Sequence, residues 1–248
     1  MKRTAGLLAE IRSFCAAHAD PKRAGRYAHY FREGYDAYGV PQEVWEAQKD
    51  AWLAAHRERL SLEGFLDVGD QLVQSGKYEE ASFAIFFIIP FREQWKAETF
   101  QRLGSWLEHG IRNWAHSDIL CGELLSHFLK DRIVPVADMS AWRVSPSKWK
   151  RRAVPVALLG LVKKPGKVPA LLKFVRPMMH DPERVVHQGL GWFLREAWKV
   201  QPDVVEAFLL PFKDSAPRLI FQYATEKMTA GDKARFRRSK ASRQRRKS

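Results

Sequence analysis

The chain has 248 residues, of which 46% are hydrophobic and 12% are aromatic, so it can bury a large core and is not a disordered protein. Its two cysteines, Cys15 and Cys121, lie far apart and outside any C-x-x-C pattern, which argues against a disulfide framework and against a cysteine-based zinc site. The longest apolar run, residues 83–91, is much shorter than the roughly 20 residues that span a bilayer. We therefore expect a soluble protein of the cytoplasm that carries a formal net charge of +14.

The sequence predicts a series of helices, beginning with its first residues. Residues 1–19 begin like a signal peptide, but Glu10 and Arg12 interrupt the apolar stretch that such a peptide needs, so the segment is predicted to be an amphipathic helix. Further along, apolar residues recur at three- and four-residue spacing, and no strand alternation competes with this pattern. The predicted helices are residues 43–59, 78–89, 94–109, 117–129, 148–162 and 182–200. The sequence therefore predicts an all-α fold.

A weak internal period indicates how the helices are arranged. Four small residues, each inside a predicted helix, lie 36 residues apart: Ala81, Ser117, Ala153 and Gly189. A period of this length is typical of helical hairpins stacked as in HEAT-like repeats, in which a small residue allows close approach of two helices. We expect residues 1–230 to form one HEAT-like α-solenoid of stacked antiparallel helical hairpins with a concave basic surface. Residues 231–248 are predicted to be a basic, disordered tail.

Charge is segregated along the chain. Residues 143–176 contain ten Lys or Arg and no Asp or Glu, and residues 233–248 contain nine basic residues and again no acid. These two segments hold +19, so the remainder of the chain sums to −5. A surface with only positive charge attracts polyanions and is typical of proteins that bind nucleic acid through its phosphates. An anionic membrane is less favoured as a partner, because the basic segment lacks a long amphipathic helix with exposed aromatic residues.

The candidate functional residues begin with Trp114 and Asp118, which lie four residues apart on one face of a predicted helix. If the repeats stack, residues at matching offsets line one surface, which adds Arg152 and Trp192. Taken singly, each tryptophan could be a core residue and the aspartate a solvated residue or a helix cap. The histidines near the pair do not have a metal-ligand spacing, and no metal site is expected.

Four segments carry a resemblance to a known family: KRAGRYAHYFREGYDAYGVP at residues 22–41, NWAHSD at 113–118, SKWKRRA at 147–153 and VVHQGLGWFLREAWKVQPDVV at 185–205. Through most of residues 20–228 the sequence resembles the DNA alkylation repair enzymes of the AlkD type, which are HEAT-like repeat DNA glycosylases. The resemblance implies excision of cationic alkylated purines, such as 3-methyladenine and 7-methylguanine, without flipping of the base into a pocket.

The same resemblance implies roles for particular residues. Trp114 and Trp192 would form the aromatic walls of the site, and Asp118 would be the catalytic carboxylate. The basic run around Arg152 is expected on the surface, in contact with DNA phosphates. The candidate DNA-binding residues are Lys148, Trp149, Arg151, Arg152, Lys163 and Lys164. Two features depart from the family pattern. Val185 and Val186 replace a pair of aromatic residues that often wedges DNA, and Pro155 lies inside a predicted helix and could kink it.

The residue types suit this chemistry. A purine alkylated at N3 or N7 is a cation and therefore a good leaving group, so the enzyme has to stabilise the positive charge that passes to the sugar. A carboxylate beneath an oxocarbenium-like sugar does so and can also hold water, as in glycoside hydrolysis. Each aromatic face attracts a cation by about 0.5 to 2 kcal/mol. An arginine fork is a natural partner of phosphate.

The sequence thus predicts a DNA glycosylase that acts as a monomer on double-stranded DNA with alkylated bases, without a cofactor, in the cytoplasm and at the nucleoid. Two alternatives remain open. The chain could be a non-catalytic binder of damaged or branched DNA with the same surface, or a helical scaffold whose charge serves an acidic protein partner.

Overall fold

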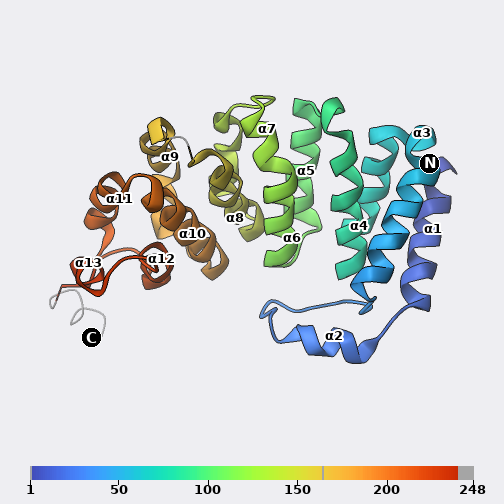
Figure 1. Ribbon diagram of the computed structural model, residues 1–248, viewed down its shortest axis with the longest axis horizontal. Helices are drawn as coiled ribbons and strands as arrows, with labels where there is room; N and C mark the ends of the chain where they lie inside the picture. Colours follow the sequence, from blue (N-terminus) through green and yellow to red (C-terminus); the bar gives the residue numbers. More distant parts are fainter. Residues whose placement is uncertain (1, 164, 240–248) are drawn as a thin grey trace. The chain divides into compact units, whose positions relative to one another are not determined.

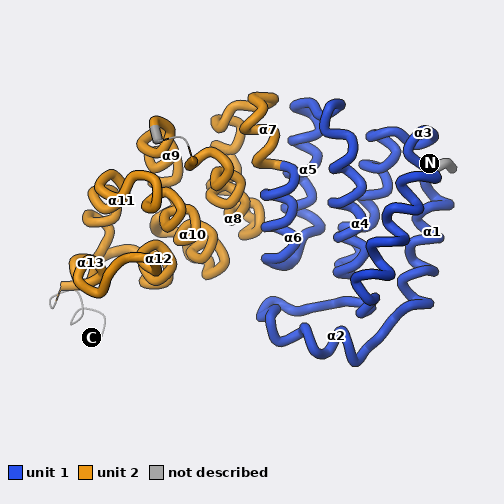
Figure 2. The backbone as a smooth tube through the Cα atoms, in the orientation of Figure 1, with its two compact units in different colours: residues 1–124 blue, residues 125–248 orange. Residues whose placement is uncertain are grey.

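The computed structural model describes residues 2–163 and 165–239 (Figure 1). The fold of this part of the chain is all-α, since it contains helices and turns and no strand, and the predicted all-α class is confirmed. The chain divides into two compact units, residues 1–124 and residues 125–248 (Figure 2). The continuity of a single domain over residues 1–230 stays a prediction. None of the helices in the described ranges is both long and apolar enough to cross a membrane.

Unit 1 is built from six α-helices of unequal length within the described residues. Their bounds are α1 Lys2–Ala17, α2 Pro21–Ala28, α3 Gln42–Gln74, α4 Tyr78–Ile88, α5 Ala97–His109 and α6 Trp114–Ile119. A 3₁₀ turn at Ile89–Gln94 precedes α5, and a π-helical segment at Leu120–Leu125 follows α6. The amphipathic helix predicted at the start of the chain is confirmed as α1, whose Leu7, Ile11 and Cys15 are fully buried at four-residue spacing.

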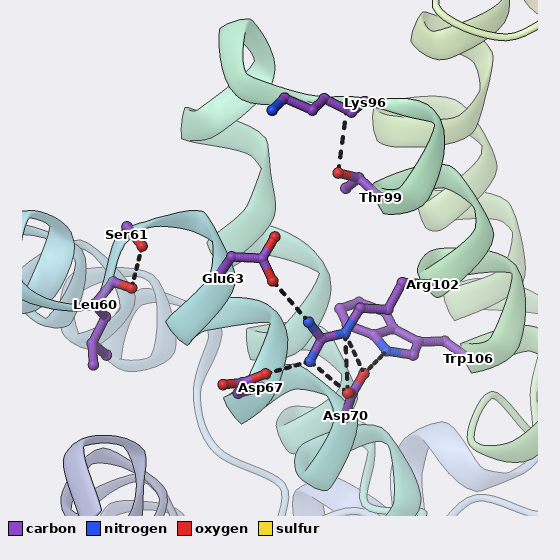
Figure 3. Close-up of polar contacts among 9 residues, drawn as sticks. All are labelled: Leu60, Ser61, Glu63, Asp67, Asp70, Lys96, Thr99, Arg102 and Trp106. Atoms are coloured by element: carbon purple, nitrogen blue, oxygen red, sulfur yellow. Dashed lines mark hydrogen bonds and ion pairs between the residues drawn. The ribbon is translucent and has the colours of Figure 1, made fainter. Parts of the chain in front are cut away.

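The longest helix of unit 1 is interrupted. α3 continues to Gln74, beyond the predicted end at residue 59, but Ser61 has φ 56° and ψ −175° and separates two helical stretches. This backbone conformation is adopted almost only by glycine and is strained for serine. The Ser61 hydroxyl donates to the carbonyl of Leu60 at 2.5 Å (Figure 3). The predicted helix of residues 43–59 is therefore present, and a second helical stretch follows Ser61 and ends at Gln74.

α3 is joined to α5 by packing and by charge (Figure 3). The buried ring of Trp106 lies against Gly69, where a Cβ atom would be 2.6 Å from the ring, and its Nε1 donates to Asp70 at 2.6 Å. Arg102 donates to the carboxylates of Glu63, Asp67 and Asp70 at 2.6 to 3.2 Å. Because these carboxylates are substantially exposed, the ion pairs add little stability, and the buried tryptophan holds the two helices together.

Unit 2 contains shorter helices. Their bounds are α7 Ser126–Lys130, α8 Lys148–Ala157, α9 Val168–Val175, α10 Arg184–Val200, α11 Pro202–Leu209, α12 Arg218–Ala224 and α13 Ala230–Arg235. Short 3₁₀ segments lie at Val136–Met139, Ala141–Val144, Leu158–Leu161, Pro165–Lys167, Arg176–His180 and Leu210–Phe212. α10 is the central element, and it packs against α8, α11 and α12. Its apolar stripe, which includes Phe193 and Leu194, is fully buried.

α8 is shorter than the predicted helix of residues 148–162. The Ser147 side chain caps it by accepting a hydrogen bond from the Lys150 amide. The α-helix ends at Ala157, two residues after Pro155, and continues as the 3₁₀ segment. Pro155 has no N–H for the carbonyl of Arg151 one turn earlier, so one hydrogen bond is missing within α8.

The predicted disordered tail begins too early. Residues 230–235 form α13, capped by Thr229, and the next residue, Phe236, is buried beside Phe221. The Phe236 carbonyl accepts from Arg218 at 2.8 Å, and the Ser239 amide donates to Asp214 at 2.7 Å. The chain is thus folded as far as Ser239 because one aromatic side chain anchors a segment that is otherwise basic. Residues 240–248 of the predicted tail lie outside the described residues.

Candidate functional site

The candidate site of unit 1 starts at the first turn of α6. Asn113 caps the helix, because its side-chain oxygen accepts a hydrogen bond from the His116 amide at 2.9 Å. Trp114 is therefore the first helical residue, and Asp118 lies one turn further along the same helix. Asp118 is half-buried and is not the helix cap, since Asn113 holds that position. The helix ends one residue later and gives way to the π-helical segment, a feature often found at functional sites.

Trp114 is held in one orientation although it is 38% exposed. Its Nε1 donates to the carbonyl of Tyr30 at 3.2 Å, and its ring stacks on Phe31 with centroids 5.5 Å apart and an interplanar angle of 17°. Both partners precede it by more than 80 residues in the chain. Because Phe31 covers one face of the indole ring, the opposite face and the edges are what a ligand could contact.

A buried histidine supports α6 from the inside. The ring of His116 contacts the side chains of Asn113 at 2.9 Å and Ser82 at 3.0 Å, and it packs against Tyr78. Burial lowers the pKa of His116 to about 4, so this imidazole is neutral at pH 7. It belongs to the core, and no group of three or more His, Cys, Asp or Glu that could hold a metal ion occurs among the described residues.

A cavity of about 610 Å³ lies beside Trp114, lined entirely by residues of unit 1. Its walls come from α2, the segment after α2, the start of α3, α4 and α6. Among its aromatic residues are Tyr27, Tyr30, Phe31, Tyr35 and Trp114. Aromatic walls of this kind suit a flat or cationic ligand.

The segment that holds Trp114, residues 29–41, is fixed to α4 by buried carboxylates. In Figure 1, α2 and this segment lie below the other helices of unit 1. Glu79 is 5% exposed and accepts hydrogen bonds from the backbone amides of Tyr38, Gly39 and Val40 at 2.7 to 3.2 Å. Glu80 accepts from the Tyr38 hydroxyl at 2.9 Å, and burial together with this bond raises the pKa of Tyr38. The position of Trp114 thus depends on carboxylates of another helix.

Cys15 is part of the same buried layer. The pKa of this thiol is raised to about 12, mainly by burial and to a smaller extent by the negative charges of Glu79 and Glu80. The cysteine therefore stays protonated at pH 7 and is a core residue rather than a nucleophile.

In unit 2, the basic run of α8 is more buried than predicted. Arg152 is only 5% exposed, and its guanidinium donates to the carbonyl of Val185 at 2.6 Å. Gly189 makes room for it, since a Cβ atom there would lie 3.2 Å from the Arg152 side chain. The predicted surface position of Arg152 is wrong, because α10 packs over this side of α8 and captures the side chain.

The neighbours of Arg152 also have structural partners. Arg151 pairs with Asp181 at 2.7 Å and donates to the carbonyl of Ser145 at 2.6 Å. Trp149 is buried, which corrects its predicted surface position, and the Lys148 amine lies 5.4 Å from its ring centroid. Lys163 is exposed, whereas Lys164 lies outside the described residues. The role of these six residues in binding DNA stays a prediction.

Trp192 lies in the middle of α10 and is half-buried. Val185 and Val186, at the start of this helix, are buried in the core of unit 2, so they present no exposed wedge. Trp114 and Asp118 belong to unit 1, and Arg152 and Trp192 belong to unit 2. That all four line one surface stays a prediction.

Sequence reasoning missed the partners of Trp114. Phe31 and Tyr30 occur in the aromatic-rich segment at residues 22–41, but no sequence spacing links them to α6. Glu79 and Glu80 could have been noticed as two adjacent carboxylates in an apolar helix. Buried carboxylates need hydrogen-bond donors, so this pair could have indicated that another segment of the chain donates to α4.

The all-α fold and the helix-borne pair of Trp114 and Asp118 define a helical protein with a candidate active site on α6. The sequence model of the family described as DNA alkylation repair enzyme matches residues 11–228. The chain belongs to this family. A solved structure described as a predicted DNA alkylation repair enzyme from Enterococcus faecalis has a similar fold, with a TM-score of 0.73 and 15% sequence identity over 86% of this chain and 98% of that chain. No curated protein matches the chain.

Proposed function

We propose that the protein is a DNA glycosylase that hydrolyses the N-glycosidic bond of cationic alkylated purines, 3-methyladenine and 7-methylguanine, in double-stranded DNA. The observation that carries the proposal is the pair on α6. An indole ring with one accessible face and a half-buried carboxylate lie one turn apart on the same helix. Family membership supports a role in repair of alkylation damage.

The reaction follows from the charges. The bond between C1′ of the sugar and the base nitrogen breaks, and its electron pair neutralises the cationic base, which therefore leaves without a general acid. Positive charge passes to the sugar, where the Asp118 carboxylate stabilises it. Water then forms the new bond to C1′, and its proton passes to Asp118 or to solvent. Because the carboxylate needs only to approach the sugar, the proposal does not require the lesion to enter a pocket.

We assign to Trp114 and Trp192 the contact with the cationic base through their π-faces. Trp114 is prepared for this role, because Phe31 and Tyr30 fix its ring before any ligand binds. A cation–π contact of about 0.5 to 2 kcal/mol corresponds to a loss of roughly 2-fold to 30-fold in kcat/KM for Trp114→Ala.

We further propose that the helices stack as a HEAT-like solenoid with a basic concave surface. Its support is the 36-residue recurrence of Ala81, Ser117, Ala153 and Gly189, which are buried in α4, α6, α8 and α10. On this surface the accessible Lys148 and Lys163 are assigned to phosphates. Arg152 instead fixes α8 to α10 through Val185. The chain would act as a monomer at the nucleoid.

The deciding experiment measures release of free 7-methylguanine and 3-methyladenine from methylated duplex DNA. Asp118→Asn keeps the shape of the side chain and removes its charge, so the rate should fall by roughly a hundredfold or more. Asp203→Asn is the matched control, because Asp203 is an exposed aspartate in the first turn of α11. Equal loss in both variants, or unchanged release by Asp118→Asn, would show that the carboxylate of α6 is not catalytic.

A non-catalytic binder of damaged or branched DNA is the second candidate. The burial of Arg152 favours it, since a residue expected to hold the DNA strand is committed to Val185. Tight binding of duplex DNA that weakens steeply with salt, without release of methylated bases by the wild type, would establish this alternative. Absence of such binding would point to the protein-binding scaffold.

A further inference from the structure

The exposed aromatic side chains of unit 1 gather at one place. Four large apolar side chains are exposed among the described residues: Tyr27, Tyr30, Trp114 and Val144. The three aromatic ones all line the cavity beside α6, and they are 47%, 60% and 38% exposed. A folded protein normally buries such surface, so aromatic residues grouped at the mouth of a cavity indicate a binding site.

Cations lie in and next to the wall that α2 contributes to this cavity, whose lining also includes Lys49 and the exposed Glu46. Residues 21–32 contain Lys22, Arg23, Arg26 and Arg32 and no acid, and Arg23 also lines the cavity. Two of the α2 cations, Lys22 and Arg26, are exposed, and Arg23 is half-buried. Basic residues that alternate with aromatic ones at this density match a strand of nucleic acid, in which phosphates alternate with flat bases.

The interior offers the two kinds of contact that a base needs. Tyr35, Trp45 and Tyr78 line it with further aromatic surface, and the exposed Gln42 adds a polar group for the edge of a base. Glu79 also lines the cavity, but its carboxylate is committed to three backbone amides. The volume of about 610 Å³ is ample for a base with part of its sugar.

We propose that this cavity, together with the cations of residues 21–32, binds an unpaired nucleobase of the DNA, distinct from the alkylated base itself. A base that has lost its partner would stack on Tyr27 or Tyr30, while Arg26 and its neighbours hold the adjoining phosphates. The inference rests on the proposed function only in taking DNA as the ligand, and it requires no excision.

The test uses DNA without alkylation, so that failure of excision and failure of this site are separate results. Two duplexes differ only in whether a 5-iodouracil is paired or unpaired. After irradiation of the complex with the full chain, mass spectrometry locates the crosslinked residue. We expect crosslinks from the unpaired base to residues 27–35. Crosslinks that map only elsewhere, or none at saturating protein, would overturn the proposal.

Affinity provides the second measurement. The wild type should prefer the duplex with the unpaired base by roughly tenfold, as stacking of one base predicts. The double variant Tyr27→Ala and Tyr30→Ala removes exposed side chains and should abolish that preference. Val144→Ala, which removes an exposed apolar side chain of unit 2, should leave it unchanged. Equal affinity of the wild type for both duplexes, or a preference that survives in the double variant, would contradict the site.

Discussion

Glu79 accepts hydrogen bonds from the backbone amides of residues 38–40, and we call this set of bonds the clamp. It can be tested by changing one side-chain atom of Glu79. In Glu79→Gln the shape of the side chain is kept, but one carboxylate oxygen becomes an NH₂ group. The Gly39 and Val40 amides both donate to Oε1, and the Tyr38 amide donates to Oε2. With the amide oxygen placed toward Gly39 and Val40, the NH₂ group faces the Tyr38 N–H, and two donors confront each other in a buried site.

The cost follows from this geometry. One charge-assisted hydrogen bond is lost, about 1.5 to 3 kcal/mol, and two others lose the charge of their acceptor. Because the segment after α2 has its own contacts with the core, we expect local opening rather than unfolding of unit 1. A loss of this size accelerates amide exchange at residues 38–40 by roughly tenfold to a hundredfold.

Hydrogen exchange followed by mass spectrometry measures this directly in the peptide that contains Tyr38, Gly39 and Val40. The matched control is Glu46→Gln, which also changes a carboxylate that lines the cavity. Glu46 is exposed and accepts only from the neighbouring Gln42 side chain among the hydrogen bonds seen in the described residues, so its change should leave exchange within threefold of the wild type. Exchange in Glu79→Gln that rises less than threefold would refute the clamp.

Three further changes probe the fold. Gly69→Ala should destabilise by about 2 kcal/mol in urea unfolding, because the new methyl group displaces the Trp106 ring, whereas Gly6→Ala, with open space around it, should stabilise through helix propensity. Ser61→Gly should stabilise by about 1 kcal/mol, since glycine adopts the observed φ without strain; a lower urea midpoint would contradict this reasoning. The buried His116 has a depressed pKa of about 4, so the unfolded state binds the proton more tightly and stability should fall as the pH drops from about 6.5 toward 4. In His116→Gln the free energy of unfolding should depend less on pH. An equal free energy of unfolding at pH 7 and pH 5 in the wild type would contradict this prediction.

The helices themselves were predictable because their signals are local. Apolar spacing identified α4 and α10 within one or two residues of their ends, and the small residues at a 36-residue interval all proved to be buried. The predicted helix of residues 43–59 ends two residues before the break at Ser61, but the second stretch of α3, which continues to Gln74, was not predicted. A single phenylalanine after α13 keeps a basic segment folded, and the predicted start of the tail missed it.

The candidate site was predictable in part. Asn113 and the spacing of Trp114 and Asp118 follow from neighbouring residues, and the structure places the pair on one helix as expected. The contacts that orient Trp114 come from residues 30 and 31, and sequence separation of this size leaves no pattern to detect. A side chain's partners across the fold are decided by packing.

Arg151 and Arg152 show why charge in a sequence is a weaker guide than charge in a structure. Adjacent residues on a helix point about 100° apart, so one arginine meets Asp181 and the other meets the carbonyl of Val185. Both cations count toward the net charge of +14, yet neither is a freely exposed cation. A phosphate would have to compete with those partners, whereas Lys163 and the α2 cations Lys22 and Arg26 are exposed. Salt-dependent binding of DNA should therefore respond more to substitutions at these exposed cations than to equal substitutions in the middle of α8.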